Sequence, residues 1–221
     1  MNKADFLKVS GGIFESDKSW SQINSFSKKS FFWDIYTNLD GAHGIYSGAP
    51  LKDLVHKKQY SIEHIIPKSF LLESLANQPK KIRYGATLNP FNLAPAHQKI
   101  NRIRGDAQYD FDGDPITKTF HVKFKSVHQD QIGFDEDREW SPPRKSRGDI
   151  ARAILYMNIC YSLRCYSKTD LDTLIHWAKA DEPSRVEVKY SQWIKQKMGI
   201  QNPFIDIPEL IEDEELYVIM V

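Results

Sequence analysis

The chain has 221 residues, of which 41% are hydrophobic and 27% are charged, and its formal net charge is +1. This composition is typical of a globular protein with its own core and excludes an intrinsically disordered chain. No apolar run approaches the ~20 residues that a membrane-spanning helix needs, so no membrane partner is expected.

The N-terminal residues MNKADFLKVSGG lack an apolar segment of signal-peptide length. We therefore expect a cytoplasmic protein, or the mature form of a secreted one from which a leader has been removed. The two cysteines, Cys160 and Cys165, are too few for a structural zinc site or a disulfide framework. Both are interpreted as small apolar residues of a helix.

The charges are unevenly distributed along the chain. Six carboxylates and no Lys or Arg follow residue 205, so the net charge of +1 becomes +7 for residues 1–205. A basic body with an acidic end is compatible with nucleic-acid binding, because such binding depends on the local charge more than on the total.

The first half of the chain alternates short helices with short strands. In chain order the pattern predicts a helix over 26–40, a strand over 60–66, a helix over 69–76, a basic loop over 77–86, a strand over 87–93 and a helix over 96–104. Pro67 ends the first strand, and the last helix lies between Pro95 and Gly105.

The second half is mostly helical. Phe120, Val122 and Phe124 alternate as in a half-buried strand over 117–127, and a loop is expected over 141–148. Helical spacing of apolar residues then predicts helices over 149–165, after Thr169, and over 183–199. The sequence therefore predicts the α+β class.

Two residues that could take part in catalysis, Glu63 and His64, lie near the end of the strand predicted over 60–66. Their side chains point to opposite faces of a regular strand, but both can reach one pocket where the strand ends. A carboxylate is a hard oxygen donor suited to Mg²⁺, and a neutral imidazole accepts a proton near neutral pH. Alone, such a pair is more often an ordinary surface feature than an active site.

Asn101 adds a second oxygen donor on the short helix that follows. Ile100 and Ile103 orient this helix, and Arg102 and Arg104 bring positive charge beside Asn101. His97 lies four residues before Asn101, on a similar helix face, where it could support the site or contact a phosphate.

Four ordered segments resemble the signature blocks of the bacterial endonuclease I family of non-specific nucleases. They are SIEHIIPKSF at 61–70, NLAP at 92–95 with INRIRG at 100–105, RGDIARA at 147–153 with Tyr156 and Met157, and NPFID at 202–206. The family belongs to the ββα-metal (His-Me finger, HNH-like) nucleases.

The resemblance implies a ββα-metal finger at about 58–106, with a small mixed or antiparallel sheet. It also implies a mainly helical lobe at about 146–205 and an acidic tail at 206–221. All would lie in a single domain over 1–221, and a monomer is expected. The later blocks would pack the helical lobe against the finger.

The resemblance also implies a role for each matching residue. His64 would be the general base, Glu63 and Asn101 would hold one Mg²⁺ ion, and Asn92 would bond across the loop and orient His64. Mn²⁺ or Ca²⁺ could substitute, and no organic cofactor is implied. Phosphate contacts are predicted for four basic residues: Lys68, Arg83, Arg102 and Arg104.

The implied reaction is the hydrolysis of phosphodiester bonds to 5′-phosphate and 3′-hydroxyl ends. Double-stranded DNA is the expected substrate, with single-stranded DNA and RNA also open, and low sequence specificity follows from phosphate contacts. This chain departs from the family at Phe91, where a His is usual, and at 199–201, where Gly-Ile-Gln replaces Gly-Asn-Arg. Secreted members often carry signal peptides and disulfides, and neither is expected from this sequence.

Two alternatives remain from the sequence. The chain could be a catalytically weak or inactive nuclease fold that binds nucleic acid or a protein, or a structural protein with an incidental Glu-His pair. A zinc hydrolase is less favoured, because no pair of His has helical ligand spacing beside a carboxylate.

Overall fold

The structure is a computed structural model that describes residues 1–23, 33, 36–113, 116–120, 132–164 and 166–221. Its helices are α1 (Lys3–Ser10), α3 (Leu51–His56), α4 (Lys68–Ser74), α5 (Lys80–Leu88), α6 (Gln98–Arg104), α7 (Arg147–Tyr161), α8 (Lys168–Ala180), α9 (Arg185–Met198), α10 (Pro203–Asp206) and α11 (Glu214–Met220). Its strands are β1 (Tyr60–His64), β2 (Leu93–His97), β3 (Lys118–Phe120), β4 (Ile132–Phe134) and β5 (Trp140–Ser141). Single 3₁₀ turns are formed by Trp20–Gln22, Pro90–Asn92, Arg144–Ser146 and Pro208–Glu212.

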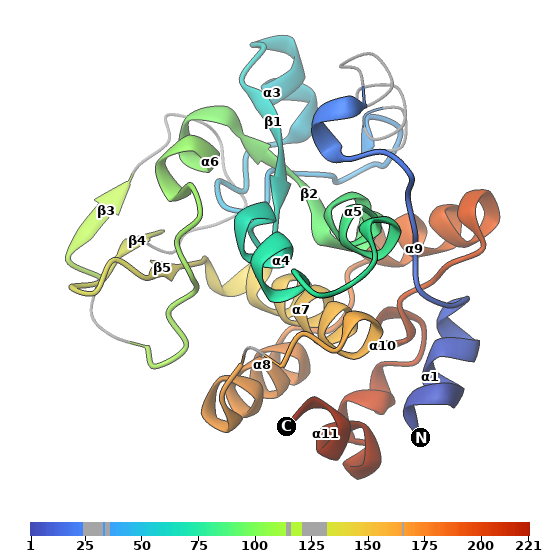
Figure 1. Ribbon diagram of the computed structural model, residues 1–221. Coiled ribbons are helices and arrows are strands. Elements are labelled where there is room, and N and C mark those ends of the chain that lie inside the picture. The colour runs from blue at the N-terminus through green and yellow to red at the C-terminus, as the bar shows by residue number, and fades with distance from the viewer. Residues whose placement is uncertain (24–32, 34–35, 114–115, 121–131, 165) are drawn as a thin grey trace.

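Helix α7 lies at the centre of the molecule, between the strand-containing half and the remaining C-terminal helices (Figure 1). Almost every residue from Gly148 to Tyr161 is buried, as is expected of a largely apolar helix at the centre of a domain. It packs most extensively on α8 and also contacts α5, α10 and α11. The α+β class predicted from the sequence is confirmed. Among the described residues, none of the helices is long and apolar enough to cross a membrane.

The finger consists of β1, β2 and α6. The two strands are antiparallel, with Glu63 opposite Ala94 and His64 opposite Leu93, and α6 follows β2 directly and contacts both strands. Pro95 lies within β2, where its carbonyl accepts from the backbone N–H of Ile45 at 2.8 Å. The backbone nitrogen and carbonyl of Pro95 thus lie on the side of β2 that faces away from β1. The missing N–H of this proline therefore removes no hydrogen bond between β1 and β2.

The segment between β1 and β2 differs from the prediction. The basic segment expected as a loop over 77–86 forms helix α5 from residue 80 onward, with Pro79 at its N-cap. The strand expected over 87–93 is wrong in its bounds, because residues 87–88 end α5 and residues 90–92 form a 3₁₀ turn in which Asn89 caps Phe91. Strand β2 begins only at Leu93. Local composition was misleading here, because tertiary packing on the N-terminal segment decides the conformation.

Gly85 shows how closely α5 approaches the N-terminal segment. A Cβ atom at this glycine would lie 2.0 Å from the carbonyl oxygen of Phe14. The backbone N–H of Ser16 also donates to the carbonyl of Lys81, at 3.0 Å. A glycine in the helix therefore permits a backbone contact that fixes α5 beside the finger.

Helix α6 begins at residue 98, two residues later than predicted, and ends at Gly105 as predicted. The later start follows from His97, whose Nδ1 accepts the backbone N–H of Lys99 at 3.2 Å and so caps the helix. Residues 118–120 form the described part of the strand predicted over 117–127, in an antiparallel β3–β4–β5 sheet. Residues 121–127 and most of the predicted helix over 26–40 lie outside the described residues.

Helices α7, α8 and α9 confirm the three helices predicted for the C-terminal half, with shifts of a few residues at their ends. Cys160 is buried in α7, and its burial raises the thiol pKa to about 12, in keeping with a small apolar role. Cys165 lies outside the described residues. The acidic segment after residue 205 is folded as α10, a 3₁₀ turn and α11, which pack on α7 and α8.

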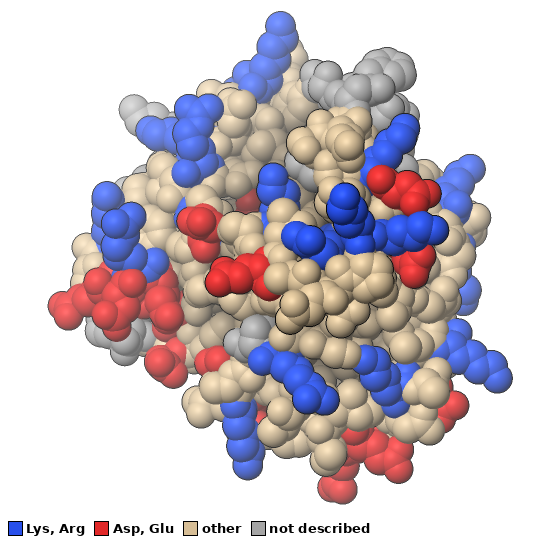
Figure 2. Space-filling model, viewed as in Figure 1, with Lys and Arg blue, Asp and Glu red and all other residues tan. Residues whose placement is uncertain are grey.

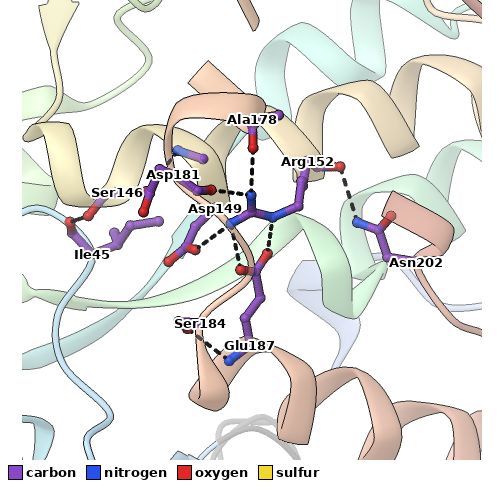
Figure 3. A network of polar contacts seen from close by, with 10 residues as sticks. Ile45, Ser146, Asp149, Arg152, Ala178, Asp181, Ser184, Glu187 and Asn202 are labelled. Carbon is purple, nitrogen blue, oxygen red and sulfur yellow. Dashed lines mark hydrogen bonds and ion pairs between the residues drawn. The ribbon is translucent and has the colours of Figure 1, made fainter. Parts of the chain in front are cut away.

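Arg152 ties three helices of this half together (Figure 3). This buried residue of α7 forms two hydrogen bonds with Glu187 of α9, at 2.8 and 2.7 Å, and donates to the carbonyls of Ala178 and Asp181 at the end of α8. Its own carbonyl accepts from Asn202 at 3.1 Å. Two of the sequence blocks are thus in direct contact within the helical lobe.

Candidate metal centre

His64 lies at the last position of β1, with its side chain partly exposed. Its Nε2 is 3.0 Å from the carbonyl oxygen of Thr87, near the end of α5. A carbonyl can only accept, so Nε2 carries the hydrogen, and in the neutral imidazole Nδ1 then holds the lone pair. His64 thus has a backbone-carbonyl partner, which selects the tautomer that can act as a base through Nδ1.

Asn92 is fully buried beside the turn that follows His64. Its Oδ1 accepts from the backbone N–H of Ile66 at 2.8 Å, and its Nδ2 donates to the carbonyl of the same residue at 3.1 Å. The backbone carbonyl of Asn92 also accepts from Ile65, at 2.9 Å. Asn92 thus bonds across the loop at the end of β1, as the resemblance implied.

Glu63 is 2% exposed and belongs to a buried polar network. One of its oxygens, Oε1, accepts from the hydroxyl of Tyr46 at 2.7 Å and from Nη1 of Arg104. Burial raises the pKa of Glu63, whereas the charge of Arg104 and these hydrogen bonds act in the opposite direction.

Asn101 is positioned on α6 by its amide nitrogen. Nδ2 donates to Oγ of Ser61 at 2.9 Å and to the carbonyl of Ile62 at 3.0 Å, both on β1. Neither bond uses the carbonyl oxygen Oδ1 of the same amide. That oxygen is available as a hard donor.

Glu63, His64 and Asn101 line one open cavity of about 270 Å³. Its other lining residues are Ile62, Pro67, Lys68, Ser69, Gly105 and Asp106. The predicted convergence of Glu63 and His64 therefore occurs, because β1 ends at His64. The two predicted ligands offer one carboxylate and one amide oxygen, Asp106 adds a second carboxylate to the lining, and the described lining residues include no cysteine. This set fits a hard divalent cation that keeps several of its waters. The roles of the three residues in metal binding and catalysis remain predictions.

The four basic residues expected to contact phosphate occupy different environments. Lys68 is exposed and lines the cavity, and Arg102 is exposed on α6. Arg83 is half-buried and lies one helical turn before Thr87, on the same face of α5 as the partner of His64.

The prediction that Arg104 contacts a substrate phosphate is wrong. The residue is 2% exposed, and its guanidinium donates to Glu63 and to the carbonyls of His64 and Ile65, the latter two at 3.0 Å. The group is directed into the protein and is not placed to contact a substrate phosphate. The sequence suggested positive charge on α6, but the packing around the helix decides which arginine faces outward.

His97 is 6% exposed and serves as the N-cap of α6. Burial lowers the pKa of its imidazole, which favours the neutral form that the cap requires. The residue supports the helix that bears Asn101, and it is not placed as an exposed phosphate contact.

Charges of both signs lie around the finger on the face shown in Figure 2, with carboxylates over α4 and between α4 and α6 as well as basic groups nearby. In this view Lys and Arg gather over the region of α4 and α5, where Lys80 and Lys81 are exposed. Carboxylates gather at the edge formed by β4 and β5 and near α11. Basic side chains therefore lie near the candidate centre together with carboxylates, and the folded acidic end of the chain packs elsewhere.

A second group of carboxylates lies next to β4 and β5. Oxygens of Asp110, Asp135 and Glu139 are within 4.8 Å of one another, and the first two residues are buried. Burial and the neighbouring carboxylates raise the pKa of Glu139. Asp110 accepts from Ser141 and from the backbone N–H of Gly113, so the group is largely bonded within the protein.

Sequence reasoning missed three residues of the candidate centre. Tyr46 precedes the finger and bonds to Glu63, Thr87 accepts from His64, and Asp106 lines the cavity with the two predicted ligands. Only Asp106 gave a local signal, as a carboxylate after the α6 stop. Tyr46 and Thr87 act through contacts with distant segments that no local pattern reveals.

The antiparallel pair of β1 and β2 followed by α6 is consistent with the core of the ββα-metal fold class. The family model for endonuclease I matches residues 13–209. The chain therefore belongs to the endonuclease I family, and a metal ion is suggested by that membership.

The curated relatives include two proteins from Bacillus, both called extracellular ribonuclease. The one from Bacillus amyloliquefaciens is 26% identical over 143 residues, and the one from Bacillus subtilis (strain 168) is 28% identical over 139 residues. Each match covers 55% of this chain and 44% of the relative. The chain thus matches less than half the length of these relatives.

Proposed function

We propose that this chain is a divalent-metal-dependent endonuclease that hydrolyses phosphodiester bonds in DNA and in RNA with little sequence preference. The supporting observation is the bond between Nε2 of His64 and the carbonyl of Thr87, at 3.0 Å. It leaves Nδ1 as the basic nitrogen of a residue that lines one cavity with two oxygen donors, Glu63 and Asn101. Mg²⁺ is the proposed ion, because two protein oxygens and several waters suit its coordination.

In the proposed reaction, His64 takes a proton from the water that attacks phosphorus, a contribution of about 10²–10⁴-fold to the rate. When bound at Glu63 and Asn101, the cation supplies Lewis-acid stabilisation of the phosphoryl oxygens and the departing 3′ oxygen. Asn92 and Thr87 keep the imidazole in position during proton transfer. The proposed products have 5′-phosphate and 3′-hydroxyl ends.

Substrate binding is proposed to depend on the phosphate backbone. Lys68 at the cavity, Arg102 on α6 and Arg83 on α5 are the proposed contacts. Backbone contacts do not identify bases, so they support low sequence specificity. The relatives named as ribonucleases favour RNA as a second substrate beside DNA. RNA and DNA share the phosphodiester bond that would be cut.

The reaction is tested with supercoiled plasmid and with an RNA transcript, each with MgCl₂ and with EDTA. The wild type is expected to cut both only with the metal. His64→Ala should lower the rate by about 10²–10⁴-fold with unchanged binding. His176→Ala is the matched control, because this exposed histidine lies on α8. Absence of metal-dependent cleavage with binding retained would leave a binding module instead.

The proposed phosphate contacts are tested in the His64→Ala protein, which is expected to bind nucleic acid without cutting it. The logarithm of the affinity should fall linearly with the logarithm of the salt concentration. Replacing Lys68 or Arg102 with alanine should reduce that slope by about 0.7–0.9 for each lost phosphate contact. Replacing the exposed Lys189 of α9 should leave it unchanged. An equal slope in all variants would refute the proposed contacts.

A further inference from the structure

A buried polar network lies behind the candidate metal centre. Arg104, Tyr46 and Tyr109 are each at most 3% exposed, and all surround Glu63, which is 2% exposed. The two tyrosine hydroxyls are 2.8 Å apart, and that of Tyr46 donates to Oε1 of Glu63 at 2.7 Å. The guanidinium carbon of Arg104 lies 4.6 Å from the ring centre of Tyr109 and 5.9 Å from that of Tyr46.

This network acts on one oxygen of the carboxylate. Both Tyr46 and Arg104 donate to Oε1, and neither bond involves Oε2. Glu63 nevertheless lines the cavity, whereas Arg104 and Tyr46 do not. A carboxylate held through one oxygen by two donors loses its torsional freedom, so its second oxygen is presented in a fixed direction.

Arg104 also holds the backbone that bears the proposed base. Nη1 donates to the carbonyl of His64 and Nη2 to that of Ile65, each at 3.0 Å. A planar guanidinium can satisfy the carboxylate and two carbonyls at once, which a lysine ammonium cannot do in the same geometry. One side chain of α6 therefore fixes both residues at the end of β1.

We propose that Arg104 and Tyr46 are positioning residues that hold Glu63 in a metal-binding orientation, with Arg104 also aligning His64. This inference rests on the proposed function. Changes to groups that orient a metal ligand typically cost 10–100-fold in metal affinity. We expect a loss of about tenfold for Tyr46→Phe and about 10–100-fold for Arg104→Lys.

The probe is Mn²⁺, and binding is followed by the decrease in the electron paramagnetic resonance signal of the free ion. Binding to other carboxylates, such as the group around Asp135, is measured in Glu63→Gln and subtracted. The control is Tyr190→Phe, because this buried tyrosine donates from its hydroxyl to the carbonyl of Pro90 at 2.9 Å. Both Tyr→Phe variants lose a buried hydrogen bond and keep the ring.

Tyr46→Phe should weaken Mn²⁺ binding and raise the Mn²⁺ concentration needed for half-maximal cleavage, whereas Tyr190→Phe should change neither. Arg104→Lys should also lower the rate at saturating Mn²⁺, since His64 is then less well aligned. Tyr46→Phe should bind as tightly as the wild type if its role is only to stabilise the fold, and that result would overturn the inference. A wild type that neither binds Mn²⁺ at Glu63 nor cleaves would instead refute the proposed function.

Discussion

Replacing Asn92 with alanine is expected to destabilise the protein and to slow cleavage. Both polar atoms of this fully buried side chain bond to the backbone of Ile66, at 2.8 and 3.1 Å. A buried polar group that loses its partner costs about 1–3 kcal/mol, so the two together should lower the free energy of unfolding by about 2–6 kcal/mol. Small domains have about 5–15 kcal/mol in total, so the loss is a large fraction.

The expected effect on the rate follows from the position of Ile66, two residues after His64. Without the side chain of Asn92, the turn at the end of β1 can relax and the imidazole can move. A displacement of about 1 Å in a catalytic group costs on the order of 10²-fold. We therefore expect the folded variant to show a kcat about 10–100-fold lower than the wild type.

Urea unfolding gives the change in stability, and plasmid cleavage below the unfolding temperature of the variant gives kcat. Asn158→Ala is the control, because this buried asparagine of α7 bonds to the carbonyl of Met220 and accepts from the backbone N–H of Arg164. It should lose stability and keep kcat. A kcat for Asn92→Ala equal to that of Asn158→Ala would refute the orienting role.

Three other changes test the framework around the centre. The pKa of His97 is lower in the folded protein than in the unfolded chain, so its neutral form contributes stability in full above the ordinary imidazole pKa of about 6.5. This contribution is lost as the pH falls through the lowered pKa of the folded state. His97→Asn keeps a helix cap and should remove this pH-dependent loss, as measured by urea unfolding at a series of pH values. Gly85→Ala should lower the free energy of unfolding by about 1–3 kcal/mol despite the better helix propensity of alanine, because its Cβ meets the Phe14 carbonyl; a more stable variant would contradict this contact. Arg152→Met should cost about 3–5 kcal/mol in the same assay, since it leaves Glu187 without its cation, and an unchanged stability would show that the network contributes little.

Much of the candidate centre was predictable from short segments of sequence. Glu63 and His64 are adjacent, the end of β1 follows from Pro67, and Asn101 lies on a helix that stops at Gly105. These features depend on neighbours in the chain, so local patterns reveal them. The ordered segments along the chain added the family, which the match over residues 13–209 confirms.

The region between the strands was not predictable in this way. A basic loop was predicted over 77–86, yet residues 80–88 form α5. Gly85 of this helix packs on Phe14, and the carbonyl of Thr87 accepts from His64. The helix depends on contacts with a segment far away in sequence. Local composition could not indicate that such contacts exist.

Arg102 and Arg104 of α6 illustrate what the sequence determines and what depends on the tertiary structure. By itself, the sequence determined that a short basic helix follows the Glu-His strand and bears Asn101. Only the tertiary structure decided that Arg102 faces solvent while Arg104 is buried against Glu63, 41 residues away. The physical reason is that an arginine can be buried only where a carboxylate and carbonyls satisfy it, and distant segments supply those partners.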